Sequence, residues 1–322
     1  MAATNQSGSH ALEFVLTGFP GLHDIQHWLS VPFLLMFIVA LFGNLMVIII
    51  IATEKTLHKP MYYFISILLV GDLITGVSLL PQVLVILWLG SQRIYFNTCI
   101  IQMFFIYFTV AMESALLVLM AYDRYTAICN PLRYSSIVTD TFILKGVLAG
   151  IVRSLSVVLP VCTLTSSLSY HIKSFVTNVY CEYLSIISVA CTRSVFNDIF
   201  LYFVFTMVIL PDIALVGISY YMIAKTTLKL KSREARLKVF RTCTSHVFVI
   251  LSFYISGALT MLIFLVKNSV PAYMNALFSV LYISIPPAFN PVIYGIKTKE
   301  ILNVILSCVQ KYKNNMFDLR ND

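Results

Sequence analysis

The sequence predicts an all-α protein: a seven-transmembrane helix bundle with a short amphipathic C-terminal helix. Hydrophobic residues make up 59% of its 322 residues and charged residues only 11%, whereas soluble domains carry about 25% charged residues. Seven apolar runs are long enough to cross a bilayer as helices, which takes about 20 residues each. A soluble protein of this composition could not cover its surface with polar groups, so we expect a chain that crosses the membrane repeatedly.

The apolar runs divide the chain into three parts. A polar tail covers 1–28, the membrane domain covers 29–296, and a cytoplasmic amphipathic helix and tail cover 297–322. The first 27 residues have neither the basic start nor the apolar centre of a cleavable signal peptide, so the first run is expected to direct its own insertion. The runs lie at residues 29–53, 61–88, 99–122, 142–162, 195–224, 244–266 and 273–296.

Basic residues set the expected orientation. Of the 22 Lys and Arg residues, 17 fall in the alternate segments 54–60, 123–145, 225–241 and 297–322. Because such segments stay in the cytoplasm, we expect a multi-pass plasma-membrane protein with an extracellular N-terminus and a cytoplasmic C-terminus. The net charge of +8 is thus a topology signal, and no nucleic-acid partner is expected. Asn5 begins an N-x-S acceptor for glycosylation in the extracellular tail.

The third run and the residues after it carry the most specific motif. Between Cys99 and Asp123 the only charged residue is Glu113, and the run ends in Met-Ala-Tyr-Asp-Arg-Tyr-Thr-Ala-Ile-Cys-Asn-Pro-Leu-Arg-Tyr at 120–134. The Asp-Arg-Tyr triplet at the end of an apolar helix resembles the rhodopsin-like G-protein-coupled receptors. The whole string resembles their odorant-receptor branch, from which only Thr126 departs.

Further motifs resemble the same family, over about residues 18–308. They are Leu-His-Lys-Pro-Met-Tyr at 57–62, Lys-Val-Phe-Arg-Thr-Cys-Thr-Ser-His at 238–246, Phe-Tyr at 253–254 and Pro-Pro-Ala-Phe-Asn-Pro-Val-Ile-Tyr at 286–294. Three features are similar to the class I, fish-like odorant receptors: Leu-Thr-Gly-Phe-Pro-Gly-Leu at 16–22, Asp212, and Tyr-Gly-Ile-Lys-Thr-Lys at 294–299.

The resemblance implies a receptor that binds a small odorant within the helix bundle. Its expected partner is a heterotrimeric G protein of the stimulatory, cyclic-AMP-raising type. No enzyme is expected, because the sequence contains no nucleophile–base pattern and no phosphate-binding glycine loop. The alternatives are a rhodopsin-like receptor for a non-odorant ligand and a membrane transporter, although the sequence lacks the inverted repeat typical of transporters.

The resemblance also implies a disulfide between Cys99 and Cys181, which would tie the third helix to the long extracellular loop over 163–194. Odorant receptors usually carry a second bridge in this loop, but His171 stands at one of its two positions. Cys191 is therefore expected to be free or to pair with Cys162. Cys308 follows a short amphipathic run, and whether it is lipidated is left open.

Two carboxylates lie inside predicted spans, Asp72 in the second and Glu113 in the third. Carboxylates at such depth are costly and are candidates for a functional site. Two neighbouring carboxylates repel each other unless one is protonated or a cation lies between them. We therefore expect either a sodium-like cation held by Asp72 and Glu113, with Asn44 and Asn290 nearby, or a protonated, hydrogen-bonded pair. Beyond that ion, no cofactor is expected.

Two further ionisable residues lie inside predicted spans. Arg153 is in the fourth run, and Asp212 follows Pro211 in the fifth. Charged side chains at these positions pair with each other or face a polar cavity, and the sequence leaves both alternatives open.

The expected ligand pocket lies among the third, fifth, sixth and seventh helices, under the 163–194 loop. Residues at i, i+4 and i+7 of the third helix share one face, and the residues outward of Tyr254 on the sixth helix would face them. The alternative is that all of these side chains only pack the bundle. The candidate residues are Met103, Tyr107, Val110, Tyr254, Gly257 and Met261.

The expected switch lies toward the cytoplasmic end. Asp123 is expected to hold Arg124 at rest, and ligand binding is expected to move the sixth helix outward so that Arg124 meets the G protein. Pro291 breaks the hydrogen-bond ladder of the seventh helix and makes a compliant point there. The candidate switch residues are Asp123, Arg124, Tyr125, Tyr220, Asn290, Pro291 and Tyr294.

Overall fold

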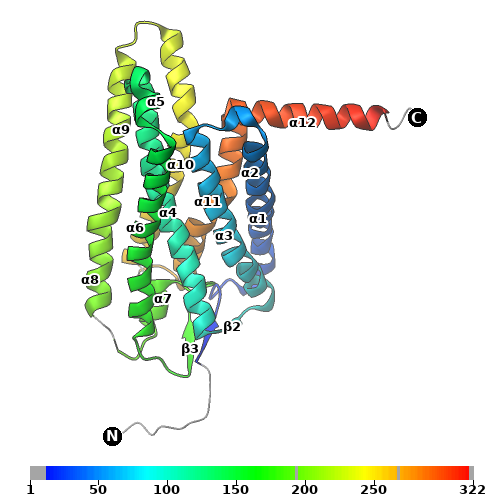
Figure 1. Ribbon diagram of the computed structural model, residues 1–322. Coiled ribbons are helices and arrows are strands. Elements are labelled where there is room, and N and C mark those ends of the chain that lie inside the picture. Colours follow the sequence, from blue (N-terminus) through cyan, green and yellow to red (C-terminus); the bar gives the residue numbers. More distant parts are fainter. Residues whose placement is uncertain (1–11, 193–194, 267–268, 319–322) are drawn as a thin grey trace.

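The computed structural model describes residues 12–192, 195–266 and 269–318. In this part of the chain, seven helical segments are long and apolar enough to cross a membrane, and they pack side by side as one bundle (Figure 1). The predicted fold class is confirmed. The segments are Gln26–Thr53, Pro60–Leu89, Phe96–Cys129, Asp140–Ser166, Val195–Leu228, Arg233–Ile263 and Tyr273–Lys297.

Each spanning segment is built from one or more helical elements. The first joins α1 (Gln26–Ile38) to α2 (Asn44–Thr53) through a π-helical turn at Val39–Gly43, and the fifth joins α8 (Val195–Val204) to α9 (Leu210–Leu228) in the same way. The other spanning helices are α3 (Pro60–Leu89), α4 (Phe96–Cys129), α6 (Asp140–Ser166), α10 (Arg233–Leu265) and α11 (Ala272–Lys297).

Local sequence explains where these helices begin and end. Pro60 is the first residue of α3, a position where its missing N–H costs no helical hydrogen bond. Gly90 ends α3 with a φ of +80°, which a glycine adopts without steric cost. Thr139 caps α6, where its Oγ1 accepts a hydrogen bond from the Phe142 N–H at 3.2 Å.

Two helices extend beyond the apolar runs that predicted them. α4 continues through the Asp-Arg-Tyr motif to Cys129, and α10 begins at Arg233, well before the apolar run at 244–266. The apolar run marks only the lipid-embedded part of a helix, because the backbone can remain helical where its side chains reach water.

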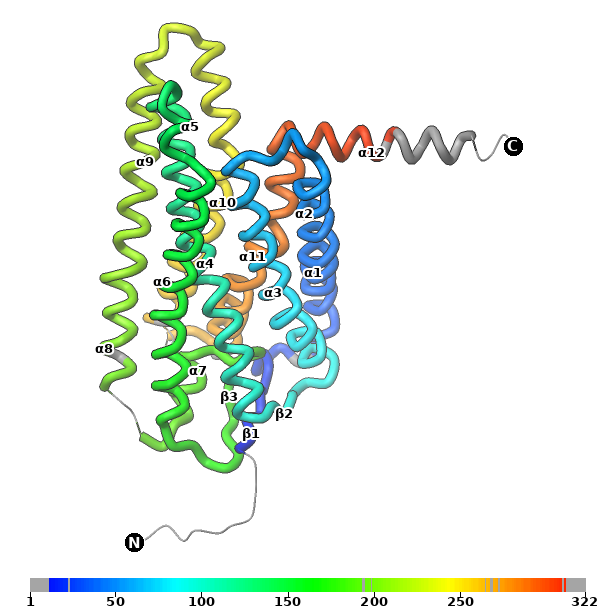
Figure 2. Tube along the Cα trace, viewed as in Figure 1, coloured from blue at the N-terminus to red at the C-terminus, as the bar shows by residue number. Residues whose placement is uncertain are grey.

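A small sheet closes one end of the bundle, which the sequence analysis did not predict. β1 (Glu13–Leu16) pairs antiparallel with β2 (Gln92–Tyr95) and parallel with β3 (Lys173–Val176). Phe14, Leu16 and Phe19 are fully buried, so part of the predicted polar tail at 1–28 is packed against the helix bundle. The trace in Figure 2 shows this sheet at the end of the bundle opposite α12 (Lys299–Asp318).

Two hydrophobic cores lie along the bundle. One joins the sheet and the 163–194 loop to the neighbouring ends of the helices, and the other joins the opposite halves of α2, α3, α4, α10 and α11. α12 leaves the end of α11 and runs crosswise to the bundle (Figure 1). The 163–194 loop also contains the short helix α7 (Tyr183–Ser188).

Candidate functional site

Asn290 bridges the two carboxylates inside the bundle. Asp72 on α3 and Glu113 on α4 are 4% and 8% exposed. The Asn290 Nδ2 group donates to Asp72 Oδ2 at 2.9 Å and to Glu113 Oε1 at 3.4 Å. The structure therefore brings together three of the four residues expected at a cation or proton site, from three different helices.

Asn44, the fourth expected residue, makes different contacts. Its Nδ2 group donates to the backbone oxygens of Ala40 at 2.6 Å and Pro287 at 2.8 Å. Pro291 has no N–H group to donate to the residue four positions earlier, which is Pro287. Asn44 thus supplies the Pro287 oxygen with the hydrogen bond that Pro291 cannot make within α11.

A cavity of about 150 Å³ lies beside the carboxylate pair, lined by Asp72, Glu113, Thr75 and Thr109 among many apolar side chains. Within the described ranges, no group of three or more His, Cys, Asp or Glu side chains could hold a metal ion. Two carboxylates and an amide oxygen are suited instead to a proton or to a hard monovalent cation. The Oδ1 atoms of Asn44 and Asn290 have no hydrogen-bond partner among the described residues.

Asp123 and Arg124 form an ion pair toward the end of α4 that lies away from the sheet, as expected for a resting arrangement. Arg124 Nη2 lies 2.8 Å from Asp123 Oδ2. Tyr134 outside the helix donates its hydroxyl to Asp123 Oδ1 at 2.7 Å. Burial and the adjacent Asp123 carboxylate raise the pKa of the Tyr134 hydroxyl above its usual range, so this donor stays protonated. Tyr125 packs its ring near Tyr122, with 6.2 Å between the ring centroids.

The other switch tyrosines have contrasting surroundings. The hydroxyl of Tyr220 on α9 lies 2.7 Å from Nδ1 of His246 on α10, and His246 is fully buried. Tyr294 is also fully buried, but its hydroxyl has no hydrogen-bond partner within the described part of the chain. The sequence analysis placed His246 only in a motif and did not identify its partner.

A large cavity lies at the same end of the bundle. The cavity has a volume of about 1130 Å³, and Arg124, His246 and Tyr294 line it. Its rim is mainly basic. The rim includes Lys59, Lys238, Arg241, Lys297 and Lys299, with Glu234 and Glu300 as acidic members.

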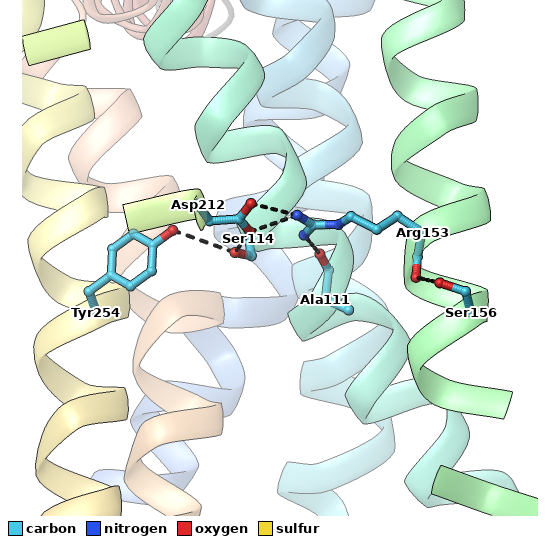
Figure 3. Close-up of polar contacts among 6 residues, drawn as sticks. All are labelled: Ala111, Ser114, Arg153, Ser156, Asp212 and Tyr254. Carbon is cyan, nitrogen blue, oxygen red and sulfur yellow. Dashed lines mark hydrogen bonds and ion pairs between the residues drawn. The ribbon is translucent and has the colours of Figure 1, made fainter. Parts of the chain in front are cut away.

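A polar network ties four helices together in the middle of the bundle (Figure 3). Arg153 on α6 binds both carboxylate oxygens of Asp212 on α9, at 2.6 and 2.7 Å. Ser114 on α4 donates to Asp212 Oδ2 at 2.5 Å, and Tyr254 on α10 places its hydroxyl 3.5 Å from Ser114 Oγ. Of the two alternatives for Arg153 and Asp212, the structure selects pairing. Ser114 was missed, since nothing local in the sequence distinguishes it.

The candidate pocket residues on α4 lie under the 163–194 loop. The hydroxyl of Tyr107 accepts a hydrogen bond from the Tyr183 N–H at 3.1 Å. Met103 is fully buried, and the hydroxyl of Thr165 lies 4.0 Å from its sulfur. Val110, one turn deeper than Tyr107, lines the cavity beside Glu113.

Gly257 on α10 packs against α11. A Cβ atom on Gly257 would lie 3.2 Å from the Tyr282 ring, so the missing side chain permits that approach. Met261 is half-buried one turn outward. The sequence analysis missed a loop contact beside them, in which the Tyr180 hydroxyl lies 2.7 Å from Ser279 Oγ on α11.

The structure contains a disulfide between Cys99 and Cys181, whose Cα atoms are 5.4 Å apart. Cys162 and Cys191 are both free thiols, one buried and one exposed, so the alternative of a bridge between them is wrong for this structure. Cys308 is exposed and free. The glycosylation acceptor Asn5 lies outside the described residues.

The fold is that of a rhodopsin-like receptor. Squid rhodopsin has a similar structure, with a TM-score of 0.71 and 16% sequence identity over 88% of this chain and 80% of the rhodopsin chain. The seven spanning helices and the Asp123–Arg124 pair thus agree with a rhodopsin-like seven-helix membrane fold.

The sequence comparisons give the family. The olfactory receptor family model matches residues 33–311, and the chain belongs to that family. Human olfactory receptor 52B2 is 37% identical over 301 residues, 94% of this chain and 93% of that protein. Human olfactory receptor 52N2 is 38% identical over 94% of each chain. Mouse olfactory receptor 56B34 is 38% identical over 92% of each chain.

The family assignment decides several predictions made from the sequence. The protein is a multi-pass membrane receptor of the rhodopsin-like class and not an enzyme. The transporter alternative is thereby removed. The relatives include the human olfactory receptors 52B2 and 52N2, which agrees with the resemblance to class I odorant receptors.

Proposed function

We propose that this receptor binds a small odorant among α4, α9, α10 and α11, beneath the 163–194 loop, and activates a stimulatory, cyclic-AMP-raising heterotrimeric G protein. The observation that carries the proposal is the network of Arg153, Asp212, Ser114 and Tyr254. This network lies between the candidate pocket and the Asp123–Arg124 pair, and it joins helices that line both.

The proposed odorant pocket beneath the 163–194 loop, called the outer pocket below, suits a ligand that is apolar or moderately polar. Met103 and Val110 offer apolar surface, and Tyr107 and Tyr254 each carry a hydroxyl group. Pockets of this kind bind small molecules by shape and apolar contact, and a few polar groups fix the orientation. A flexible methionine side chain also adapts to ligands of different outline.

The proposed transmission begins at Tyr254. A ligand against this ring would displace a hydroxyl that is 3.5 Å from Ser114, which is a weak contact by hydrogen-bond standards. α10 would then move outward at its cytoplasmic end and separate Tyr220 from His246. Arg124 would leave Asp123, and the Tyr220 hydroxyl released from His246 would stabilise the open arrangement together with the Tyr294 hydroxyl.

The cytoplasmic cavity is suited to a segment of a partner protein. Its volume of about 1130 Å³ exceeds the range of about 300–1,000 Å³ that is typical of small-molecule pockets. Its basic rim favours a partner segment that ends in, or carries, carboxylates. Arg124 lies in the lining, so this partner would compete directly with Asp123 for the guanidinium group.

The site between Asp72 and Glu113 is proposed to hold a sodium-like cation at rest. One amide donor shared between two buried carboxylates leaves negative charge that a cation or a proton must balance. Replacing sodium by N-methylglucamine is expected to increase agonist potency of the wild type but not of Glu113→Gln. If potency is equally insensitive to sodium in both, the pair is balanced by a proton.

The orientation proposed from the basic residues puts β1 outside the cell and α12 in the cytoplasm. Asn5 would then be available for glycosylation. An epitope placed before residue 12 should stain intact cells, and treatment with an N-glycosidase should shift the receptor's electrophoretic mobility unless Asn5 is replaced by Gln. Staining only after permeabilisation would overturn this orientation.

The decisive experiment is a cyclic-AMP reporter screen with a diverse odorant panel, with Arg124→Ala as the control. Surface amounts are matched through the N-terminal epitope. We expect at least one odorant to raise cyclic AMP in wild-type cells and to have no effect with Arg124→Ala. Normal signalling by Arg124→Ala at equal surface expression would contradict the proposed role of Arg124 in activation.

A further inference from the structure

The cavity beside Asp72 and Glu113 extends to the lipid-facing surface of the bundle. Its lining includes Val70 and Ile74 on α3, which are 45% and 37% exposed. These two residues are one turn apart and share a helix face. A cavity whose walls include side chains that face lipid can be filled from the bilayer.

Gly71 opens this mouth of the cavity. A Cβ atom added at Gly71 would lie 3.9 Å from Thr109 on α4, so the space on this face of α3 is not filled by a side chain. The half-buried Val147 and Ile151 on α6 form the other side of the lining. α3, α4 and α6 therefore contribute apolar residues around the space that Gly71 leaves open.

The cavity becomes polar toward its inner end. Asp72 and Glu113 lie there, and the hydroxyl groups of Thr75 and Thr109 lie 2.6 Å apart. Thr109 donates to the backbone oxygen of Ile106 at 2.9 Å, so Thr75 donates to Thr109. The threonines and carboxylates thus present acceptors to an occupant. They disfavour an anion and accept a hydroxyl donor.

The volume limits the size of an occupant. Apolar cavities of about 150 Å³ bind molecules such as benzene or xenon, and this cavity has that volume. Sterols and drug-sized ligands are excluded, because their pockets measure about 300–1,000 Å³.

We propose that this cavity is a second ligand site, filled from the bilayer by a neutral molecule about the size of benzene that carries at most one hydroxyl donor. Of the outer-pocket candidates only Val110 lines this cavity, which opens between α3 and α6, so the proposal goes beyond the odorant site described above. Its occupant contacts Glu113 on α4, Phe253 on α10 and Tyr282 on α11. Binding there acts on the switch from beside Glu113, one turn or more deeper than Tyr107 and Met103 of the outer pocket.

Fluorobenzene is a suitable probe, because its fluorine resonance reports binding without any need for signalling. The full-length receptor in nanodiscs is titrated with fluorobenzene, and empty nanodiscs correct for partition into lipid. We expect saturable line broadening above that of empty discs for the wild type. Broadening equal to that of empty discs would overturn the proposal.

Two leucine substitutions locate the site. Gly71→Leu places a side chain in the mouth of the cavity, and Gly217→Leu places one in open space on α9, where a Cβ atom meets nothing within 4 Å. We expect Gly71→Leu to lose all saturable broadening and Gly217→Leu to retain it. Retained binding in Gly71→Leu, or equal loss in both variants, contradicts the proposed location.

Gly71→Ala decides the question if Gly71→Leu does not reach a folded state. Its added methyl group makes only ordinary contact with Thr109 at 3.9 Å. It takes about one methyl group of space from the occupant, so binding should weaken about threefold. An unchanged affinity in Gly71→Ala, with saturable binding in the wild type, would place the bound probe elsewhere.

Discussion

Arg153 and Asp212 form a doubly hydrogen-bonded ion pair between α6 and α9, with the Arg153 Nη1 atom 2.6 and 2.7 Å from the two carboxylate oxygens. The second guanidinium nitrogen donates to the backbone oxygen of Ala111 at 3.1 Å, so the pair also fixes both helices to α4. In lipid, each charge is tolerated because the other is present. We therefore expect that removing one partner destabilises the receptor more than removing both.

Asp212→Leu and Arg153→Met are each expected to lower the stability of the receptor, and the double variant is expected to recover most of the loss. Breaking a fully buried pair costs about 3–5 kcal/mol, and replacing both partners by apolar residues is often neutral. The melting temperatures of the purified variants measure this loss, with surface amount as a second readout. A double variant no more stable than the weaker single variant would contradict the pairing argument.

Tyr220→Phe is expected to raise basal signalling, whereas Tyr294→Phe is expected to leave it unchanged. Tyr220→Phe removes the partner of the buried His246 Nδ1 in the resting arrangement, and such a loss costs about 1–3 kcal/mol. The resting state is weakened, so basal cyclic AMP should rise; because the same hydroxyl is proposed to stabilise the open arrangement, the maximal odorant response should fall. The Tyr294 hydroxyl has no partner among the described residues, so Tyr294→Phe leaves the resting state unchanged and should lower the maximal odorant response.

Both tyrosine variants are compared at equal surface expression, with and without a saturating odorant. His246→Phe serves as the matched control for Tyr220→Phe, because it removes the other half of the same contact. It should raise basal cyclic AMP as well. A fall in basal signal in either variant would show that the Tyr220–His246 contact belongs to the active state.

Cys181→Ser is expected to prevent surface expression, whereas Cys191→Ser should not. The Cys99–Cys181 disulfide joins α4 to the 163–194 loop. The neighbouring loop residues Val179, Tyr180 and Tyr183 are buried in the hydrophobic core next to the sheet. Removing a native disulfide typically costs about 2–5 kcal/mol. Cys191 is exposed and free, so it controls for the chemistry of the substitution. Surface staining of the N-terminal epitope measures both, and normal staining of Cys181→Ser would show that the loop docks without the disulfide.

The fold was predictable because its signals are local. A stretch of about 20 apolar residues predicts a spanning helix wherever it occurs, and the break at Pro291 follows from the missing N–H group alone. The residues that pair between helices were not predictable. Arg153 and Asp212 are separated by 59 positions, and whether they meet depends on how α6 and α9 rotate and tilt against α4. Those quantities are set by packing.

Other contacts depend on features that a sequence does not display. Asn44 was expected beside Asp72 and Asn290, yet it donates to Pro287, whose carbonyl lost its helical donor at Pro291. The sheet was missed because each strand has only four residues, and β1 pairs with segments far along the chain. Such short strands are stabilised by the burial of Phe14 and Leu16 and not by local preference.

The sheet provides a further test at Gly18, which follows β1 in the turn toward α1. Gly18 and Gly21 have φ angles of +75° and +89°, so alanine at either position carries a similar backbone strain, about 1–2 kcal/mol. Only at Gly18 would the added Cβ atom also collide, 2.8 Å from Ile86 Cγ2. Gly18→Ala is therefore expected to loosen β1 more than Gly21→Ala.

Amide hydrogen exchange of Val15 and Leu16 measures that loosening, and exchange should be faster in Gly18→Ala than in Gly21→Ala. The Gly18 N–H also donates to the Asn178 oxygen at 3.3 Å, so odorant potency should fall together with the protection of β1. Ile86→Leu removes the methyl branch that the new Cβ atom meets, and it should therefore restore protection to Gly18→Ala but not to Gly21→Ala. Equal exchange in the two alanine variants would mean that backbone strain alone, and not the collision with Ile86, loosens the strand.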